Sequence, residues 1–327
     1  MKRIIAYDGG GTKTQAAAYD GLGNRLFEKT TTGSNYLSVK TDGFKAVIGS
    51  LFHDILKTLD WRVSDVDFIV LGLSGADNEK EHALLESLCS DVFGDIPFRV
   101  VNDAWIVLRS GLKNSFGATA ISGTGTNSAA LAPNGERAIL RSYGYTSGTY
   151  GGGLDIAREA LHHAFRADER SGPMSALLER IPRTLGLSDI DAVAQRLHPD
   201  SGLTREDYGN ITALVMDVAC EGDAVALGIL ERIGRSIGEQ TAGVILRVGI
   251  EDAAVPVVIG GKVFTGKCPV LIEHMMEAIH QVCPSAYLVR PPYPPVTGAY
   301  LMALDALGIE QTDLIEDNLV KGGVRHG

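Results

Sequence analysis

One stretch near the start of the chain, Arg3–Thr14, has residue types that suit phosphate chemistry. In it a short apolar run ends at Asp8, and three glycines, Thr12 and Lys13 follow. Glycine has no Cβ, so an anion can approach its backbone amides closely. The hydroxyl and the ammonium beside these amides add donors for phosphate oxygens, and the carboxylate suits Mg²⁺, which prefers oxygen ligands. A glycine-rich β-hairpin explains the same residues equally well, so this stretch alone leaves both interpretations open.

A second stretch of the same kind, Ser122–Asn127, has the sequence SGTGTN and follows another apolar run. Three further runs that are typical of strands also end in polar residues or glycines. In open α/β sheets, ligands bind outside the carboxyl ends of the strands. This agreement favours the phosphate site over the plain hairpin. The strand ends concerned are Asp8, Ser74, Asn102-Asp103, Gly123-Thr124 and Gly260-Gly261.

The apolar pattern predicts the elements that position these residues, and the pattern occurs twice. Each half opens with three strands in a meander, after which helices and strands alternate. The first half has predicted strands at 4–7, 15–19, 25–29, 68–73 and 98–101, and helices at 43–59, 78–93 and 104–112. The second half has predicted strands at 117–121, 128–131, 136–140, 255–259 and 286–289, and helices at 154–166, 223–247, 270–281 and 296–307. The tail from Gly308 is left unassigned.

This duplication predicts an α/β protein with two lobes, each a mixed sheet with helices, and a nucleotide cleft between the lobes. Residues 1–115 form the N-terminal lobe and residues 116–327 the C-terminal lobe in this division. The second lobe carries a predicted helical insertion at about 168–222, broken at Pro173, Pro182 and Pro199. Whether the last helix or the tail packs back on the first lobe is left open.

Charge and composition exclude several classes of function. The chain has 327 residues with 40 acidic and 30 basic side chains, a formal net charge of −10. This balance argues against nucleic-acid and membrane partners, because both favour a basic face. No apolar run is long enough to span a bilayer, and Asp8 follows the first residues too closely for a signal peptide, so a cytoplasmic protein is expected. The four cysteines form no CxxC pair and are expected to be buried free thiols.

The motifs in their order resemble the actin-like ATPase superfamily, which includes sugar kinases, Hsp70 and actin. Within it the chain is similar to N-acetylglucosamine kinase and the related BadF/BadG/BcrA/BcrD ATPase family. The resemblance covers nearly the whole chain. It rests on DGGGTKT at 8–14, GSN at 33–35, LSG at 73–75, NDA at 102–104, ISGTGTN at 121–127, EGDAVAL at 221–227 and IGG at 259–261.

The resemblance implies an ATP- and Mg²⁺-dependent transfer of phosphate to a hydroxyl of an amino sugar, most simply N-acetylglucosamine or a related sugar. In such a kinase, Asp8 holds Mg²⁺ through water, and Asp103 is the general base that accepts the proton of the sugar hydroxyl. A homodimer is expected by resemblance only. The residues implied to contact ATP are Gly10, Gly11, Thr12, Lys13, Gly123, Thr124, Gly125, Gly260 and Gly261. Those implied on the sugar side are Asn35, Asn102, Asp103, Thr126, Asn127, Gly144 and Thr149.

The chain departs from its relatives in the stretch Tyr143–Gly152. Many of them carry a GWG…GDEGS signature there, whereas Thr149 and Tyr150 stand here in place of the acidic pair. The aspartate of that signature usually accepts hydrogen bonds from sugar hydroxyls. Thr149 can make one such bond, but a neutral and weaker one, so the identity of the sugar and the affinity for it are left open.

Two alternative functions follow from the same resemblance. One is an ATPase that activates a reductase or dehydratase, which needs cysteines for a [4Fe–4S] cluster; no cysteine follows the second glycine-rich turn closely, which disfavours it. The other is a catalytically impaired sensor of a sugar or nucleotide. Retention of Asp8, Thr12 and Asp103 together argues against the sensor. For Asp103 by itself, a plain helix cap is the simpler competing explanation.

Overall fold

The computed structural model describes residues 2–113, 116–198 and 202–322, and these form two compact units. The first unit comprises the chain up to Thr119 together with the residues from Val289 onward, and the second comprises Ala120–Leu288. The sequence analysis had placed the residues after 289 in the second lobe and left the packing of the last helix open. The structure therefore groups this C-terminal segment differently, for a reason that lies in its contacts.

The first unit is built on a five-stranded mixed sheet. Its first strand is antiparallel to the second and parallel to the fourth, which in turn is parallel to the fifth. The strands lie in the order β3-β2-β1-β4-β5. Their bounds are β1 Arg3–Gly9, β2 Lys13–Asp20, β3 Arg25–Thr32, β4 Phe68–Leu73 and β5 Phe98–Asn102.

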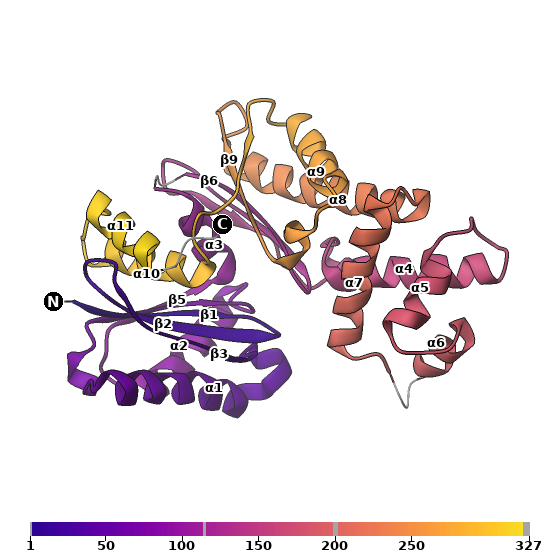
Figure 1. Ribbon diagram of the computed structural model, residues 1–327. Coiled ribbons are helices and arrows are strands. Elements are labelled where there is room, and N and C mark those ends of the chain that lie inside the picture. The colour runs from indigo at the N-terminus through magenta and orange to yellow at the C-terminus, as the bar shows by residue number, and fades with distance from the viewer. Residues whose placement is uncertain (1, 114–115, 199–201, 323–327) are drawn as a thin grey trace. The chain divides into compact units, whose positions relative to one another are not determined.

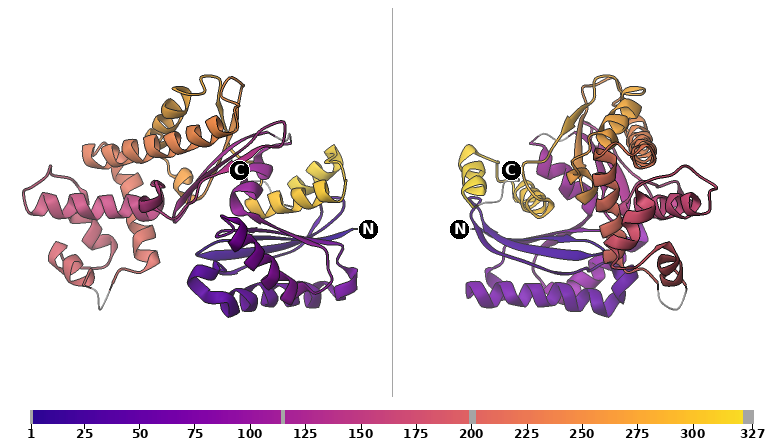
Figure 2. Two further views of the ribbon diagram at one scale, coloured as in Figure 1. Left: turned by 180° about the vertical axis from the view of Figure 1, so that it is seen from behind. Right: turned by 45° about the vertical axis from the view of Figure 1, so that its right-hand side comes forward.

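Alternation along β1 sends its side chains into two separate cores, one on each face of the sheet. Ile5 and Tyr7 pack with residues of α1 and α2, whereas Ile4 and Ala6 pack with residues of α3, α10 and α11. Figure 1 shows α1 and α2 below this sheet and α10 and α11 above it, and Figure 2 shows the same layers from behind. The helices span α1 Tyr36–Leu59, α2 Glu79–Phe93, α3 Asp103–Gly111, α10 Pro295–Ala306 and α11 Asp313–Lys321.

Helix α10 explains why the C-terminal segment belongs to the first unit. Tyr300 stacks on Tyr19 of β2 with ring centroids 4.3 Å apart, and its hydroxyl donates a 3.1 Å hydrogen bond to the carbonyl oxygen of Asp20. The Tyr19 hydroxyl lies 3.1 Å from the hydroxyl of Thr297. These buried contacts join two segments far apart in the chain, which no local pattern could reveal.

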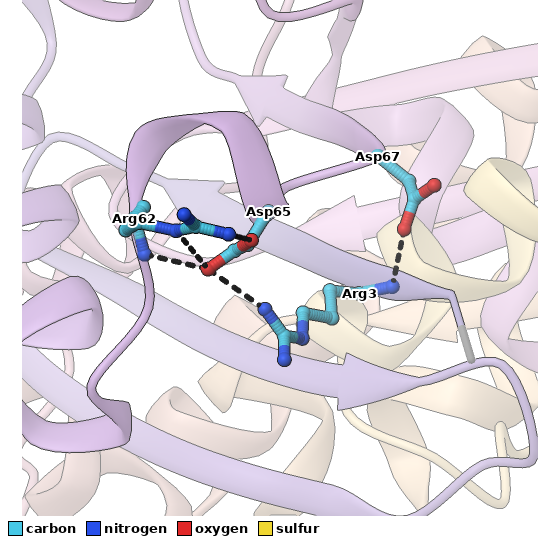
Figure 3. A network of polar contacts seen from close by, with 4 residues as sticks. All are labelled: Arg3, Arg62, Asp65 and Asp67. Carbon is cyan, nitrogen blue, oxygen red and sulfur yellow. Dashed lines mark hydrogen bonds and ion pairs between the residues drawn. The ribbon is translucent and has the colours of Figure 1, made fainter.

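An ionic network holds the first residue of β1, at the end of the strand opposite Asp8 (Figure 3). The backbone N–H of Arg3 donates to the Asp67 carboxylate at 2.8 Å, and the Arg3 guanidinium lies 2.9 Å from the Asp65 carboxylate. Arg62 hydrogen-bonds the same carboxylate and lowers the pKa of Asp65 to about 2. The network joins β1 to the turn η1 (Val63–Asp65) that precedes β4.

The second unit repeats the strand order of the first. Its sheet has the order β10-β9-β6-β7-β8, so β6 to β10 occupy the places that β1 to β5 occupy in the first sheet. This match confirms the duplication and the α/β class predicted from the sequence. The bounds are β6 Gly117–Ser122, β7 Thr126–Leu131, β8 Arg137–Ile139, β9 Pro256–Gly260 and β10 Tyr287–Val289.

Helices of the second unit include the predicted insertion. Helices α8 and α9 pack side by side, while α4, α5, α6 and α7 form a second group (Figure 1). The predicted break at Pro182 is wrong, because Pro182 lies inside α5, near its end, where its missing N–H costs a single ladder bond. Pro199 lies outside the described residues. The helices span α4 Gly153–Asp168, α5 Leu177–Thr184, α6 Ile190–Arg196, α7 Arg205–Cys220, α8 Ala224–Arg247 and α9 Val270–His280.

Three smaller expectations also changed. Helix α1 begins at Tyr36 rather than at Gly43, because a kink at Lys40 (φ 63°) joins two helical segments. The unassigned tail contains α11. The cysteines are free thiols as expected, but Cys220 is exposed and only Cys89, Cys268 and Cys283 are buried. Among the described helices, none combines the length and the apolar character needed to cross a membrane.

Candidate active site

The register of the first sheet brings its predicted site residues to one edge. Asp8 of β1 pairs with Gly72 of β4, and Leu73 of β4 pairs with Asn102 of β5. The backbone N–H of Ser74 continues the ladder with a 2.8 Å hydrogen bond to the carbonyl oxygen of Gly9. Because the three strands are parallel, their carboxyl ends meet there, as the sequence predicted.

The hairpin between β1 and β2 is packed against the loop that precedes α1. The Gly10 N–H donates to the Lys13 carbonyl oxygen at 2.9 Å, and the Gly10 carbonyl accepts from the N–H groups of Ser34 and Asn35 at 3.0 and 3.3 Å. A Cβ on Gly33 would lie 2.4 Å from the Gly11 carbonyl oxygen, so only glycine permits this approach. The amide of Gly10 is thus used inside the hairpin. The side chains of Thr12 and Lys13 are exposed at its tip.

Asn35 and Asn102 each cap a helix at this edge. The Asn35 side-chain oxygen accepts from the Leu37 N–H at the start of α1, and its Nδ2 donates to the Ser74 hydroxyl at 3.2 Å. The Asn102 side-chain oxygen accepts from the Ala104 N–H at 2.9 Å and caps α3. The cap of α3 is therefore Asn102, and the competing explanation of Asp103 as the cap is wrong. Asp103 is the first residue of the helix.

The electrostatics of this edge favour protonated carboxyl groups. Burial, followed by the charges of Asp8 and Asp77, raises the pKa of Asp103 to about 7. Burial raises the pKa of Asp8 to about 6, against an opposing effect of the Lys13 charge. Both side chains are half-buried. A carboxyl group that titrates near neutrality can accept a proton at the pH at which most enzymes work.

Asp77 is a further residue of this edge, and the sequence analysis missed it. Its Oδ1 accepts a 2.6 Å hydrogen bond from Nδ2 of Asn102. Burial, followed by the charge of Glu81, raises the pKa of Asp77 to about 6. The motif at 73–75 ends two residues before Asp77. A search for acidic residues anywhere in the strand-end loops, and not only directly after the strands, could have found it.

The second unit brings its glycine-rich turn, the start of α4 and the end of β9 together. The Gly123 N–H donates to the Gly125 carbonyl oxygen at 2.9 Å, two residues ahead, whereas the Gly10 N–H of the first hairpin donates three residues ahead, to Lys13. The Gly123 carbonyl accepts from the Gly153 N–H at 2.8 Å. A Cβ on Gly261 would lie 2.2 Å from the carbonyl oxygen of Ser122. The predicted phosphate residues 123–125 and the predicted adenosine residues 260–261 are thus neighbours within this unit.

Two predicted sugar-side residues use their polar atoms inside the second unit. The Thr126 hydroxyl donates to the Ile121 carbonyl oxygen at 2.8 Å, and the Asn127 side-chain oxygen accepts from the Ser128 N–H at 2.9 Å. Both residues are at most 9% exposed. These contacts give both residues a structural role in the turn and in β7, whatever they contact besides.

The loop that departs from the relatives folds around the carbonyl oxygen of Gly144. The Thr149 hydroxyl donates to this oxygen at 3.0 Å, and Thr149 is only 3% exposed. Ser147 donates to the same oxygen through its N–H and its hydroxyl, each at 2.9 Å. Burial, followed by a hydrogen bond with Glu159 of α4, raises the pKa of the Tyr150 phenol. Thr149 and Tyr150 therefore both make contacts within their own unit.

A magnesium site at Asp8 would depend on the nucleotide. Within the described ranges, no group of three or more His, Cys, Asp or Glu side chains is arranged to hold a metal ion. Mg²⁺ in phosphate-transferring proteins is usually bound by one or two carboxylates, substrate phosphates and water. A single half-buried carboxylate beside the glycine-rich hairpin fits that donor set.

Comparison with known proteins shows the family. The model of the BadF/BadG/BcrA/BcrD ATPase family matches residues 7–303, from within β1 to near the end of α10, which includes both hairpins. The chain belongs to this family. The resemblance stated from the motifs is thereby confirmed, and the family name places this BadF/BadG/BcrA/BcrD member among ATPases.

Two relatives align with most of this family member. An N-acetyl-D-glucosamine kinase of Dictyostelium discoideum is 28% identical, over 93% of this chain and 98% of the relative. An N-acetylmuramic acid/N-acetylglucosamine kinase of Clostridium acetobutylicum is 26% identical, over 80% of this chain and 86% of the relative. Among solved structures, one from Chromobacterium violaceum with a provisional N-acetylglucosamine kinase name has a TM-score of 0.71 at 20% identity, over 93% of this chain and 99% of that one. At 20% identity, the likeness to the Chromobacterium violaceum structure shows a shared fold.

Proposed function

We propose that this BadF/BadG/BcrA/BcrD family member is a kinase that transfers the terminal phosphate of ATP to a hydroxyl of an amino sugar, N-acetylglucosamine or a close relative of it. The observation that carries the proposal is the position of Asp103 and its raised pKa. Asp103 is half-buried at the carboxyl end of β5, at the edge that also holds Asp8, and its pKa is raised to about 7. The two relatives that act on amino sugars support the choice of substrate.

In this mechanism Asp103 accepts the proton of the attacking sugar hydroxyl. A positioned general base contributes about 10²- to 10⁴-fold to the rate. The rest of the catalysis in phosphoryl transfer is positioning and charge stabilisation. Asn35, which caps α1 at the same edge, orients the sugar through a hydrogen bond. Asn102, which is 3% exposed and has both ends of its amide bonded within the protein, holds the start of α3 beside Asp103.

The glycine-rich hairpin of the first unit, residues 10–13, binds the phosphates of ATP, with the Lys13 ammonium as a cation for their oxygens. The turn 123–125 of the second unit binds phosphate in the same way, and residues 260–261 adjoin the adenosine. Asp8 would hold Mg²⁺, which when bound neutralises charge on the phosphates. The charge of Lys13 reaches Asp8 and stabilises its ionised form.

A phosphotransfer screen tests the proposal. Hexoses, N-acetylhexosamines, N-acetylmuramic acid and small polyols are incubated with ATP and Mg²⁺, and sugar phosphate is detected by mass spectrometry. We expect one N-acetylated amino sugar to be phosphorylated faster than the other compounds. Phosphorylation of none of them, together with no ATP binding by calorimetry in the presence of Mg²⁺, would overturn the proposal.

The two alternatives give different results in the same experiments. An activator of a reductase or dehydratase would show iron–sulfur absorbance after anaerobic purification. A sensor would bind ATP or sugar by calorimetry without forming sugar phosphate. Asp103, whose pKa is raised to about 7, is suited to accept a proton, which favours the kinase over the sensor.

A further inference from the structure

The loop between β4 and α2 holds the two asparagines of the candidate site. The Ser74 hydroxyl receives a hydrogen bond from Nδ2 of Asn35 at 3.2 Å, and Oδ1 of Asp77 receives one from Nδ2 of Asn102 at 2.6 Å. Neither Ser74 nor Asp77 has a role in the proposed chemistry. Because one loop contacts both amides, its conformation affects both sides of the predicted sugar site.

The Asp77 contact determines how the Asn102 amide is oriented. Asn102 is 3% exposed. Its Oδ1 accepts from the Ala104 N–H and its Nδ2 donates to Asp77, so both ends of the amide have defined partners. This amide caps α3, and Asp103 is the first residue of that helix. Loss of the Asp77 contact would therefore alter the orientation of the Asn102 amide, and through it the start of α3, where Asp103 lies.

A carboxylate at position 77 is electrostatically unfavourable, and a structural contact with Asn102 does not require one. Burial, followed by the charge of Glu81, disfavours its ionised form, and its charge adds to that of Asp8 in disfavouring ionisation of Asp103. A neutral acceptor would hold the Asn102 amide without placing a third carboxylate at this edge. Unfavourable electrostatics of this kind are commonly retained at functional sites.

We propose that Asp77 is a positioning residue for phosphotransfer, which acts through Asn102 to fix the start of α3 and the carboxylate of Asp103. The inference rests on the proposed role of Asp103 as the base. A displacement of a catalytic group by a fraction of an ångström to 1 Å costs up to about 100-fold in rate. The loss of Asp77 therefore lowers kcat for the sugar and leaves the KM for ATP unchanged.

A double-mutant cycle tests the link between the two residues. We expect Asp77→Ala and Asn102→Ala each to lower kcat by about tenfold or more, and the double variant to be no worse than the poorer single variant. Asp77→Asn keeps an oxygen acceptor for Asn102 and should recover most of the activity. Asp91→Ala, on the exposed part of α2 where Asp91 pairs with Lys45, is the control and should match the parent.

The outcomes show whether Asp77 positions the catalytic group or only stabilises the fold. Additive losses in the double variant, an unchanged kcat in Asp77→Ala, or equal rises in both KM values with a lowered Tm would each overturn the inference. If Asp77→Ala does not fold, Asp77→Ser replaces it in the cycle. The serine side chain is uncharged and shorter than that of aspartate.

A second measurement does not depend on the substrate. In crystal structures of the variants, we expect the Asn102 amide to keep its orientation in Asp77→Asn and to turn away from it in Asp77→Ala. An unmoved amide in Asp77→Ala would overturn the inference even if the parent phosphorylates an amino sugar. A parent that phosphorylates no sugar, with an amide that moves as expected, would overturn the proposed function and leave the link from Asp77 to Asn102 standing.

Discussion

Gly261 and Ser122 approach so closely that a Cβ on Gly261 would lie 2.2 Å from the Ser122 carbonyl oxygen. Gly261 follows β9 and Ser122 ends β6, which are neighbouring strands of the second sheet. Gly261 also has a φ of 97°, a conformation that L-residues with side chains rarely adopt. The glycine is therefore required by the packing of the chain itself, apart from any nucleotide that binds beside it.

Gly261→Ala should destabilise the second unit and weaken ATP binding, because the methyl group must displace the turn 122–125. The matched control is Gly135→Ala, where φ is 89° but nothing lies within 4 Å of the added methyl. We expect about 1–2 kcal/mol of lost stability in the control, from backbone strain alone, and a larger loss in Gly261→Ala. Thermal unfolding and calorimetric titration with ATP measure the two effects. Equal stability losses in the two variants would show that the contact with Ser122 is relieved at no cost.

Asp103→Asn should lower kcat for the best sugar by about 10²- to 10⁴-fold, since the amide cannot accept the hydroxyl proton. ATP affinity should stay within a factor of a few. The measurement is steady-state kinetics with coupled detection of ADP, with Asp91→Asn on exposed α2 as the control. Full activity of Asp103→Asn would mean that another group takes the proton.

The rate should rise with pH through neutrality. Asp103 must be ionised to act as a base, and burial, with the charges of Asp8 and Asp77, raises its pKa to about 7. We therefore expect kcat/KM for the sugar to fall tenfold for each pH unit below this value. The experiment is a pH–rate profile from pH 5 to pH 9 at saturating ATP. A profile that is flat down to pH 5 would contradict a raised pKa of Asp103 in the enzyme–ATP complex, which is the form present at saturating ATP.

The raised pKa of Asp103 makes the stability of the fold fall with rising pH, whereas the rate is expected to rise. The unfolded-state pKa of an aspartate is about 4, so between about pH 4 and pH 7 the folded protein binds the proton of Asp103 more tightly than the unfolded chain does. The contribution of this group to stability is greatest at low pH and is lost as pH rises through that window. Asp103→Asn should therefore raise the Tm at pH 8 relative to the parent, with little difference at pH 4. A lowered Tm at pH 8 would show that the ionised carboxylate stabilises the fold.

Thr149→Val should separate a structural role of Thr149 from contact with a sugar. The variant loses the hydroxyl hydrogen bond to the Gly144 carbonyl oxygen, which still accepts from the backbone N–H of residue 149 at 3.2 Å and from Ser147. We expect about 1 kcal/mol of lost stability and little change in the KM for the sugar. Ser147→Ala, which removes the other hydroxyl bonded to that carbonyl, is the matched control. A large rise in the sugar KM with unchanged stability would instead place the Thr149 hydroxyl on the substrate.

The sequence by itself determined the order of elements and the residues at the strand ends. The strand and helix periods of the apolar residues are local properties, so the two meanders, the duplication and the positions of Asp8, Asn102 and Asp103 could be predicted. Turn residues such as the glycines of the two hairpins are equally local, because their backbone requirements depend on few neighbours.

Only the tertiary structure decided which loops come together. Asp77 lies four residues beyond its strand and contacts Asn102 on another, while Thr149 turns its hydroxyl toward Gly144. Tyr300 joins α10 to β2 across almost the whole chain. The raised pKa values of Asp8, Asp77 and Asp103 depend first on burial, and that of Asp103 depends also on the charges of Asp8 and Asp77. Desolvation and charge coupling arise only when distant segments pack, so no local pattern of residues encodes them.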